Sequence, residues 1–217
     1  MTLELFADDA ADLPRAERLA EGAVVLRRFA AAHASRLMEA VQSVLERAPL
    51  RRMTTPGGQK MSVEMSNCGT AGWISDRCGY RYSPIDPANG REWPALPRAF
   101  LDLARAAAAE SGFAGFVPDA CLVNCYVPGT RLSLHQDKDE RDFAAPIVSV
   151  SLGLPATFLF GGLRRADPPR AVPLAHGDVV VWGGPARLRY HGVRPLADGE
   201  HSVTGRRRFN LTLRKAL

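Results

Sequence analysis

The sequence predicts a mainly β protein of the α+β class, in which an antiparallel sandwich or jelly roll follows two helices. Apolar side chains recur at helical spacing in residues 31–48 and again in residues 98–111. From residue 120 onward the chain instead has about seven short runs of β character, separated by glycine and proline turns. No helical pattern connects these runs, so we expect the strands to pair antiparallel rather than through parallel crossovers.

The beginning of the chain contains one predicted strand and one predicted helix. Residues 1–20 are expected to form a loosely held arm, and Ala23–Arg28 predicts a short strand. The helix predicted over residues 31–48 ends before Pro49, because proline disfavours the helical conformation of the residue before it. Its apolar stripe consists of Leu37, Val41, Val44 and Leu45. Such a stripe belongs to the core and predicts no function.

The segment 53–97 is rich in turns and mixes aromatic with basic side chains. Alternation predicts short strands at 61–65 and 77–82, with a loop at 67–73 between them. The aromatic and methionine side chains are Met65, Trp73, Tyr80 and Tyr82, and the cations are Arg51, Arg52, Lys60, Arg77 and Arg81. Because bases stack on aromatic rings and phosphates attract cations, the mixture suits a single-stranded nucleic-acid surface. A hairpin whose aromatic rings pack on the domain below explains it equally well.

The second half of the chain is predicted to hold a helix and then the β core. An alanine-rich helix over 98–111 is stopped by Gly112, which suits the left-handed position after a helix. The predicted strands after it are 120–127, 131–136, 147–152, 156–160, 179–182, 187–193 and 206–214. We expect one domain over 1–217, with its jelly-roll core at about 118–217. The turn-rich part at about 50–90 lies outside that core, and we expect it to be the mobile part.

Composition and charge are those of an ordinary globular protein. With 46% hydrophobic and 24% charged residues, wholesale disorder is not expected. The net charge of +5 and the pI near 9.3 permit a polyanionic partner such as nucleic acid, but they fit a merely basic enzyme as well. No run approaches the roughly 18 apolar residues that span a bilayer, and the acidic N-terminus is unlike a signal peptide. The cytoplasm is therefore the expected compartment.

Four cysteines are present, and their spacing does not resemble that of a zinc site. They are Cys68, Cys78, Cys121 and Cys125. In the cytoplasm we expect them to be reduced thiols that act as small buried hydrophobic side chains.

The stretch Leu132–Glu140, with the sequence LSLHQDKDE, contains a candidate metal-binding pair. His135 and Asp137 are two residues apart, so in an extended strand both side chains project from one face. An imidazole and a carboxylate are two of the three ligands in the 2-His-1-carboxylate triad of non-haem Fe(II) oxygenases. His191 is the candidate for the third ligand. A lone H-x-D pair is more often part of a solvated strand face, so other features of the sequence are needed to distinguish a metal site from such a face.

Two predicted strands carry polar residues along one face. Asn124 and Tyr126 share a face in one of them. In the last strand the polar face consists of Arg208, Asn210, Thr212 and Arg214, and the opposite face of Phe209, Leu211 and Leu213. If the polar face lies inside the sandwich, the two arginines need anionic partners, which a small dicarboxylate provides. The alternative is an edge strand whose arginines face solvent.

Together these motifs resemble those of bacterial AlkB-type nucleic-acid demethylases, which are Fe(II)- and 2-oxoglutarate-dependent dioxygenases. The shared order is H-x-D, a distal histidine, and then arginines 17 and 23 residues later. The matching stretches are Thr55–Gly58, Met61-Ser62, Asn67–Gly69, Gly72-Trp73, Tyr82–Pro87, Leu132–Glu140, Pro146–Pro155, His176–Gly184 and Asn210–Thr212. The resemblance is thinner at 1–20, 164–174 and 198–206.

The resemblance implies a double-stranded β-helix core with a nucleotide-recognition lid at about 50–90. It implies that Fe(II) is bound by His135, Asp137 and His191, which form the catalytic centre. It implies that 2-oxoglutarate is held by Asn124, Tyr126, Arg208, Asn210 and Arg214. The residues implied to surround the damaged base and its strand are Met65, Trp73, Tyr80, Asp139, Glu140 and Arg165.

The activity implied by the resemblance is oxidative demethylation of bases such as N1-methyladenine and N3-methylcytosine. The substrate would be single-stranded DNA, with RNA or duplex DNA read by base flipping as further possibilities. The reaction would consume O2 and 2-oxoglutarate and release formaldehyde, succinate and CO2. A monomer without a membrane partner is expected. Three alternatives stay open: an RNA-directed demethylase, an oxygenase acting on protein or a small molecule, and a catalytically silent nucleic-acid-binding module.

Overall fold

Strand β15, Arg208–Arg214, shows how the alternation of side chains organises the fold. In the computed structural model, which describes residues 15–217, its apolar side chains Phe209, Leu211 and Leu213 pack toward the helices. Its polar side chains therefore point the other way, into the space between two sheets. The neighbouring strands β10, Ile147–Gly153, and β13, Val179–Trp182, contribute apolar residues to the same helix-facing cluster. One face of this sheet is thus a hydrophobic core layer, and the opposite face is free to carry a polar site.

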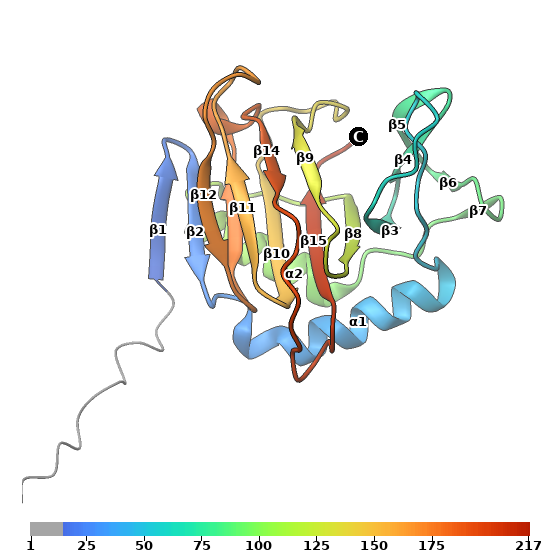
Figure 1. The fold of residues 1–217 in the computed structure, drawn as a ribbon, viewed down its shortest axis with the longest axis horizontal. Helices are drawn as coiled ribbons and strands as arrows, with labels where there is room; N and C mark the ends of the chain where they lie inside the picture. Colours follow the sequence, from blue (N-terminus) through green and yellow to red (C-terminus); the bar gives the residue numbers. More distant parts are fainter. Residues whose placement is uncertain (1–14) are drawn as a thin grey trace, which may run out of the picture.

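Two antiparallel sheets face each other in the structure (Figure 1). The larger sheet has the strand order β1-β2-β13-β10-β15-β8-β3, and the smaller has the order β12-β11-β14-β9. The remaining strands of the two sheets are β1 (Arg15–Ala20), β2 (Ala23–Arg27), β3 (Glu64–Gly69), β8 (Ala120–Tyr126), β9 (Leu132–His135), β11 (Ala156–Phe160), β12 (Arg170–Leu174) and β14 (His191–Val193). The predicted jelly roll of the double-stranded β-helix type is confirmed.

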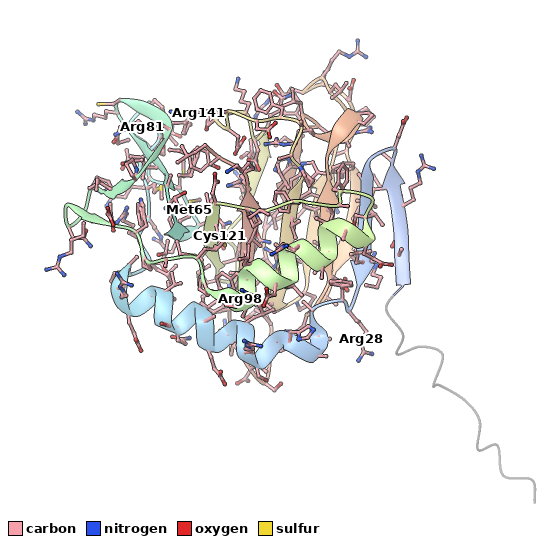
Figure 2. All side chains as sticks on the ribbon, turned by 180° about the vertical axis from the view of Figure 1, so that it is seen from behind. Arg28, Met65, Arg81, Arg98, Cys121 and Arg141 are labelled. Atoms are coloured by element: carbon pink, nitrogen blue, oxygen red, sulfur yellow. The ribbon has the colours of Figure 1, made fainter. Side chains whose placement is uncertain are left out.

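The helices cover the outer face of the larger sheet, as the view from behind shows (Figure 2). They are α1 (Ala34–Arg47) and α2 (Arg98–Glu110), with the short 3-10 helices η1 (Ala31–His33) and η2 (Gly184–Ala186) elsewhere in the chain. Leu37 and Val41 of α1 and Phe100 of α2 are fully buried against the sheet. Gly112 follows α2 with a φ of +86°, a conformation that glycine adopts without strain. Both predicted helices are confirmed.

A second hydrophobic cluster fills part of the space between the two sheets. It includes Ile147 and Trp182 from the larger sheet and Phe158, Phe160 and Val193 from the smaller one. These side chains hold the sheets together, and the polar residues of β15 lie on the same inner face. The site described below is therefore walled by apolar packing.

Two small hairpins stand beside β3, outside the sandwich (Figure 1). They consist of β4 (Gly72–Asp76) with β5 (Gly79–Ser83), and β6 (Ile85–Asp86) with β7 (Arg91–Glu92). Arg51 forms an ion pair with the buried Asp86 at 2.5 Å and lies over the ring of Trp93, with its guanidinium carbon 5.1 Å from the ring centroid. These contacts attach the base of the hairpins to the core. The mobility of 50–90 stays a prediction.

The prediction of a loosely held arm is wrong for its last six residues. Arg15–Ala20 form β1, which pairs antiparallel with β2. An ion pair between Glu17 and Arg27, at 2.5 Å, joins the two strands. The sequence RAERLA carries little apolar alternation, so this strand is defined mainly by its pairing partner. Residues 1–14 of the predicted arm lie outside the described residues.

The strand predicted at 61–65 starts later and runs further than expected. It is β3, Glu64–Gly69, so the loop predicted over 67–73 is wrong except for Thr70 and Ala71 between β3 and β4. The register of β3 comes from its pairing with β8, where Cys68 lies opposite Cys121. A pairing between segments so distant in the chain leaves no local signal.

Other strands also differ from the prediction. Strand β5 is Gly79–Ser83 rather than 77–82, and the strand predicted at 187–193 is confined to His191–Val193. Strand β12, Arg170–Leu174, was not predicted because Pro173 interrupts its pattern. It lies at the edge of the smaller sheet, where a strand tolerates proline.

The expectation of four buried thiols is correct for three of them. Cys68, Cys121 and Cys125 are buried, whereas Cys78 is exposed in the turn between β4 and β5. All four are free thiols. Within residues 15–217, none of the helices has the length and apolar character that crossing a membrane requires.

The fold predicts a loss of stability in mild acid that depends on His176. The backbone N–H of Gly153 donates a hydrogen bond to His176 Nδ1 at 2.9 Å, which requires that nitrogen to be unprotonated. Partial burial, and then the adjacent His201, lower the pKa of His176 below its ordinary value. Its contribution to stability is therefore complete above the unfolded-state pKa of about 6.5 and is lost as the pH falls below it. We expect the free energy of unfolding to fall less between pH 7 and pH 5 in His176→Gln than in wild type, as measured by urea denaturation. Equal pH dependence in the two proteins would contradict this.

A candidate metal and carboxylate site between the sheets

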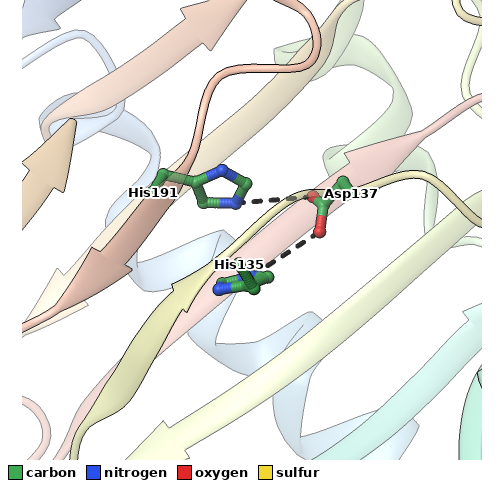
Figure 3. A group of neighbouring side chains, drawn as sticks. All are labelled: His135, Asp137 and His191. Atoms are coloured by element: carbon green, nitrogen blue, oxygen red, sulfur yellow. Dashed lines mark ion pairs between the residues drawn. The ribbon is translucent and has the colours of Figure 1, made fainter. Parts of the chain in front are cut away.

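The three predicted metal ligands come together between the two sheets (Figure 3). His135 ends β9 and His191 begins β14, and these two residues lie opposite each other in the pairing of the strands. Asp137 lies just beyond the end of β9. Its two carboxylate oxygens are 3.6 Å from His135 Nε2 and 3.7 Å from His191 Nε2. One ligand atom from each residue lies within 4.8 Å of the others, a spacing that suits a single metal ion.

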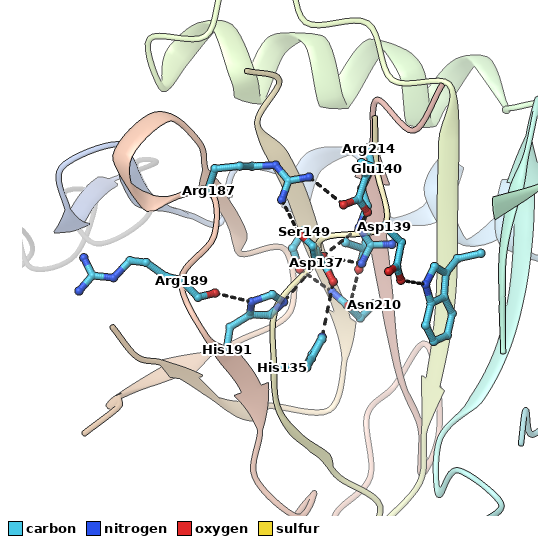
Figure 4. Close-up of polar contacts among 12 residues, drawn as sticks. His135, Asp137, Asp139, Glu140, Ser149, Arg187, Arg189, His191, Asn210 and Arg214 are labelled. Atoms are coloured by element: carbon cyan, nitrogen blue, oxygen red, sulfur yellow. Dashed lines mark hydrogen bonds and ion pairs between the residues drawn. The ribbon is translucent and has the colours of Figure 1, made fainter. Parts of the chain in front are cut away.

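Hydrogen bonds on the far side of each imidazole orient the two histidines. His135 Nδ1 lies 2.9 Å from the carbonyl oxygen of Ser133, and His191 Nδ1 lies 3.1 Å from that of Arg189 (Figure 4). A carbonyl only accepts, so each Nδ1 carries the proton and donates it. The Nε2 lone pair of each ring is then free and faces Asp137. This is the arrangement that metal-binding histidines require.

Burial and charge keep Asp137 and His191 in their metal-binding protonation states. Burial, with the neighbouring His135, lowers the pKa of His191 to about 3, so this ring is neutral at physiological pH. Burial acts to raise the pKa of Asp137, but the charge of Arg214 and the two histidines outweigh it and hold that pKa well below its usual range. The side chain of His135 is 35% exposed, whereas Asp137 and His191 are buried. Solvent therefore reaches the site partly from the His135 side, whereas Asp137 and His191 are shielded from it.

Arg214 lies next to this centre and compensates the charge of Asp137. Its Nε and Nη2 donate to the same oxygen of Asp137, at 2.9 and 2.6 Å. It also forms an ion pair with Glu140 at 3.4 Å. The guanidinium thus bridges two buried carboxylates, and its own charge is balanced without any further ligand.

Arg208, at the other end of the polar face of β15, is in the opposite situation. It is 1% exposed, and its Nη2 donates to Ser151 Oγ at 3.0 Å. Its guanidinium carbon lies 4.9 Å from the centroid of the Tyr126 ring. Within the part of the chain that the structure describes, Arg208 Nε and Nη1 have no hydrogen-bond partner and no carboxylate neutralises them. A buried guanidinium of this kind fits an anionic ligand, because burying an unpaired charge costs several kcal/mol. Burial accordingly lowers the pKa of Arg208.

The polar residues between the two arginines form a hydrogen-bonded floor. Asn210 Nδ2 donates to Ser149 Oγ at 2.8 Å and to the carbonyl oxygen of Val150 at 3.0 Å. Asn210 Oδ1 accepts from Thr212 Oγ1 at 3.1 Å and lies 3.4 Å from Asn124 Nδ2. The prediction that the polar face of this strand lies inside the sandwich is confirmed. An edge strand with solvent-facing arginines is excluded, because β15 lies between β10 and β8.

Two residues without a predicted role at this centre belong to the same network: Arg187, which Figure 4 shows, and Tyr82. Arg187 is buried and donates to the carbonyl oxygen of Asp137 at 2.7 Å, to Glu140 at 3.0 Å and to the carbonyl oxygen of Ala145 at 3.1 Å. The Tyr82 hydroxyl donates to Glu140 at 2.7 Å, and burial raises its pKa well above the ordinary value. No motif marks Arg187, because a buried arginine and a solvated one look the same in sequence, and Tyr82 was predicted only as an aromatic residue of this segment.

The predicted base-contacting residues fall into two groups. Trp73 and Tyr80 stack with ring centroids 5.6 Å apart and 11° between their planes, and Trp73 Nε1 donates to Asp139 Oδ2 at 2.7 Å. These three lie together at the hairpin of β4 and β5. The other group consists of Met65, Glu140 and Arg165.

In the second group, Met65 and Glu140 are buried and Arg165 is exposed. Met65 is buried in β3, opposite Asn124 of β8. Glu140 is buried among its three partners. Arg165 is exposed and lies over the Tyr190 ring, with its guanidinium carbon 6.0 Å from the ring centroid. Their substrate contacts stay predictions.

Comparison with known proteins gives consistent results. Residues 22–214 match the 2OG-Fe(II) oxygenase superfamily. The chain is 57% identical over 214 residues to the alpha-ketoglutarate-dependent dioxygenase AlkB of Salmonella typhimurium, covering 99% of this chain and 98% of that protein. It is 56% identical to the protein of the same name from Escherichia coli, with the same coverage. The solved structure of OsALKBH1 superposes with a TM-score of 0.80 at 28% identity, covering 93% of this chain and all of that one.

The buried charge of Arg208, whose Nε and Nη1 have no hydrogen-bond partner among the described residues, predicts opposite effects on stability and on ligand binding. In Arg208→Met the ligand-free protein should be as stable as wild type or about 1 kcal/mol more stable, because an uncompensated buried charge is removed. Binding of 2-oxoglutarate to the Zn(II)-loaded variant should weaken by about 100-fold, as the loss of charged hydrogen bonds implies. Thermal unfolding and isothermal titration calorimetry measure the two effects.

Arg206→Met is the matched control for this variant. Arg206 is exposed and forms an ion pair with Asp198 at 2.8 Å, two residues before Arg208. Its loss should change neither quantity by more than about 0.5 kcal/mol. A destabilised Arg208→Met that still binds 2-oxoglutarate as wild type does would show that Arg208 has only a structural role.

Proposed function

This chain belongs to the AlkB family of the 2OG-Fe(II) oxygenase superfamily, and on that premise we propose that it repairs alkylated bases in nucleic acid by oxidative demethylation. It is an Fe(II)- and 2-oxoglutarate-dependent dioxygenase, whose reaction requires Fe(II), 2-oxoglutarate and O2. The substrates proposed are bases of the N1-methyladenine and N3-methylcytosine type in single-stranded DNA. RNA, and duplex DNA with the base flipped out, are further substrates of the same chemistry.

The observation that carries the proposal is the pairing of an intact His-Asp-His centre with a buried guanidinium, that of Arg208, which has no anionic partner among residues 15–217. His135, Asp137 and His191 would hold Fe(II). Asn124, Tyr126, Arg208, Asn210 and Arg214 would hold 2-oxoglutarate, with the free Nε and Nη1 of Arg208 available for one carboxylate. When bound, Fe(II) and 2-oxoglutarate supply the activation of O2 that allows a methyl C–H bond to be hydroxylated, with succinate and CO2 as coproducts. The hydroxylated N-methyl group then leaves the base as formaldehyde.

The protein's own contribution is to position the reactants and keep the centre dry. Trp182 lies edge-on to the His191 ring at a centroid distance of 4.9 Å, and Phe158 lies at 6.0 Å. These apolar walls limit water access to His191, which is buried. Arg214 keeps Asp137 ionised, and Arg187 holds its backbone carbonyl. The ligand set is therefore preorganised by the network around it.

The stacked pair of Trp73 and Tyr80 supports a base substrate. N1-methyladenine and N3-methylcytosine carry a positive charge, and a cation over an aromatic face is stabilised by the ring quadrupole. Asp139, held by Trp73 Nε1, adds a negative charge beside that face. The methyl group blocks the pairing edge of such a base, which lowers the cost of flipping it out. Met65, Glu140 and Arg165 are proposed as further residues around the base and its strand.

Three wider features complete the proposal. Residues 50–90 act as a nucleotide-recognition lid, residues 118–217 as the catalytic core, and the whole chain as one domain. The protein acts as a monomer in the cytoplasm. The net charge of +5 suits a polyanionic substrate.

The direct test is mass spectrometry of a single-stranded DNA oligonucleotide that contains one N1-methyladenine. After incubation with the protein, Fe(II), 2-oxoglutarate and O2, we expect the mass of one methylene group to be lost, and omission of any addition should abolish the loss. A parallel RNA oligonucleotide distinguishes a DNA-directed from an RNA-directed enzyme. Slow consumption of 2-oxoglutarate without demethylation of either would indicate an oxygenase with another substrate.

Asp137→Ala separates the enzyme from a silent binding module. Loss of a metal ligand should abolish turnover and the consumption of 2-oxoglutarate. Binding of the methylated oligonucleotide, measured by fluorescence anisotropy, should persist if the aromatic surface is intact. Wild-type turnover in Asp137→Ala would refute the metal assignment.

A further inference from the structure

Tyr82 connects the β4–β5 hairpin (Gly72–Ser83) to the charged network behind the metal site. It lies on β5, opposite Trp73 of β4, in the hairpin that also carries Tyr80. Its hydroxyl donates to Glu140 Oε1 at 2.7 Å and lies 3.4 Å from Arg214 Nη1, which donates to it. The proposed base-contacting aromatic residues therefore share a hairpin with a residue that touches the partner of Asp137.

The network that receives Tyr82 is an alternating series of buried charges. Asp137 contacts Arg214, Arg214 contacts Glu140, and Glu140 contacts Arg187. All four side chains are at most 8% exposed, so their interactions are little screened by water. Arg214 donates hydrogen bonds to Asp137 on one side, and on the other it donates to Tyr82 and forms an ion pair with Glu140.

A divalent cation bound to Asp137 would weaken the electrostatic attraction between Asp137 and Arg214. The cation would neutralise part of the negative charge of Asp137, which would then attract Arg214 less strongly. The remaining negative charge near Arg214 within the described chain is Glu140, whose oxygen also accepts from Tyr82. The contacts among Arg214, Glu140 and Tyr82 should therefore strengthen when the metal binds, and with them the attachment of the hairpin.

We propose that Tyr82 is a positioning residue, which couples closure of the β4–β5 hairpin over the base to occupancy of the metal and 2-oxoglutarate positions through its contacts with Glu140 and Arg214. This inference rests on the proposed function, because it assumes that the metal binds at Asp137. The coupling is reciprocal: whatever ligand occupancy adds to the stability of the closed hairpin, the closed hairpin adds to ligand affinity. The exposed hydrogen bond between Trp73 and Asp139 fixes the aromatic face, whereas the half-buried Tyr82 contacts the charged network behind the metal site.

Hydrogen–deuterium exchange tests this coupling without relying on turnover. Exchange would be followed by mass spectrometry in peptides covering 72–83 and 147–152, with and without Zn(II) and 2-oxoglutarate. In wild type we expect the ligands to slow hairpin exchange by about fivefold to tenfold, as hydrogen bonds to charged groups imply. In Tyr82→Phe the ligand-induced slowing should fall below about twofold. A purely structural role of the hydroxyl would accelerate exchange equally with and without ligands and leave that ratio unchanged.

Asp76→Asn is the matched control within the same hairpin. Asp76 forms an exposed ion pair with Arg81 at 2.8 Å, which does not leave the hairpin. This variant should keep the wild-type ratio even if its basal exchange is faster. The response of residues 147–152 to the ligands should be the same in all three proteins.

Ligand affinities separate the two possible failures. We expect Tyr82→Phe still to bind Zn(II) and 2-oxoglutarate, with affinity weakened by no more than the lost coupling of about fivefold to tenfold, because Tyr82 is not itself a ligand. Wild-type slowing in Tyr82→Phe, or no slowing in wild-type protein that binds both ligands, would overturn the inference and leave the proposed function intact. Wild-type protein that binds neither Zn(II) nor 2-oxoglutarate would overturn the proposed function and this inference with it.

Discussion

The buried ion pair between Arg214 and Asp137 is the interaction on which the site depends. A carboxylate placed between two imidazoles inside a protein would take up a proton unless a cation compensated it. Arg214 provides that cation through two hydrogen bonds to one oxygen and leaves the other oxygen facing His135. Arg214 needs a second anion in turn, which is Glu140, and Glu140 is balanced by Arg187. The charges around the metal position are therefore one connected system, and a change in any member alters the others.

The sandwich allows this polar system to exist inside a hydrophobic fold. Alternation along β15 sends Phe209, Leu211 and Leu213 into the core under the helices and sends the polar residues between the sheets. The smaller sheet supplies the two histidines, through the pairing of β9 with β14. One strand thus stabilises the fold with one face and builds the site with the other. Arg208 is the exception within this balanced system, because its charge is left for a ligand to neutralise.

The sequence predicts the chemistry of the centre better than its surroundings. The alternation along β15 was predictable because strand periodicity is a local property, whereas the choice of its inner face stayed open and the grouping of His135, Asp137 and His191 was implied by the resemblance. The strands β1 and β12 and the bounds of β3 were not, because their patterns are weak and their pairing partners are distant in the chain.

The burial of charged residues around the site could not be predicted from the sequence either. Arg187 has no predicted role in the sequence, yet it donates hydrogen bonds to the carbonyl oxygens of Asp137 and Ala145 and to the carboxylate of Glu140. Glu140 was assigned to the substrate on resemblance alone, and the structure adds its buried contacts with Arg187, Arg214 and Tyr82. Tyr82 was recognised as an aromatic residue of the hairpin, but its hydroxyl contact depends on tertiary structure.

A crystal structure of the protein, grown without O2 and with Mn(II) and 2-oxoglutarate, tests these site assignments most directly. We expect Mn(II) to be bound by His135, Asp137 and His191, and the far carboxylate of 2-oxoglutarate to accept hydrogen bonds from Nε and Nη1 of Arg208. Mn(II) bound by other residues, or Arg208 without a carboxylate in the ligand-bound structure, would contradict them.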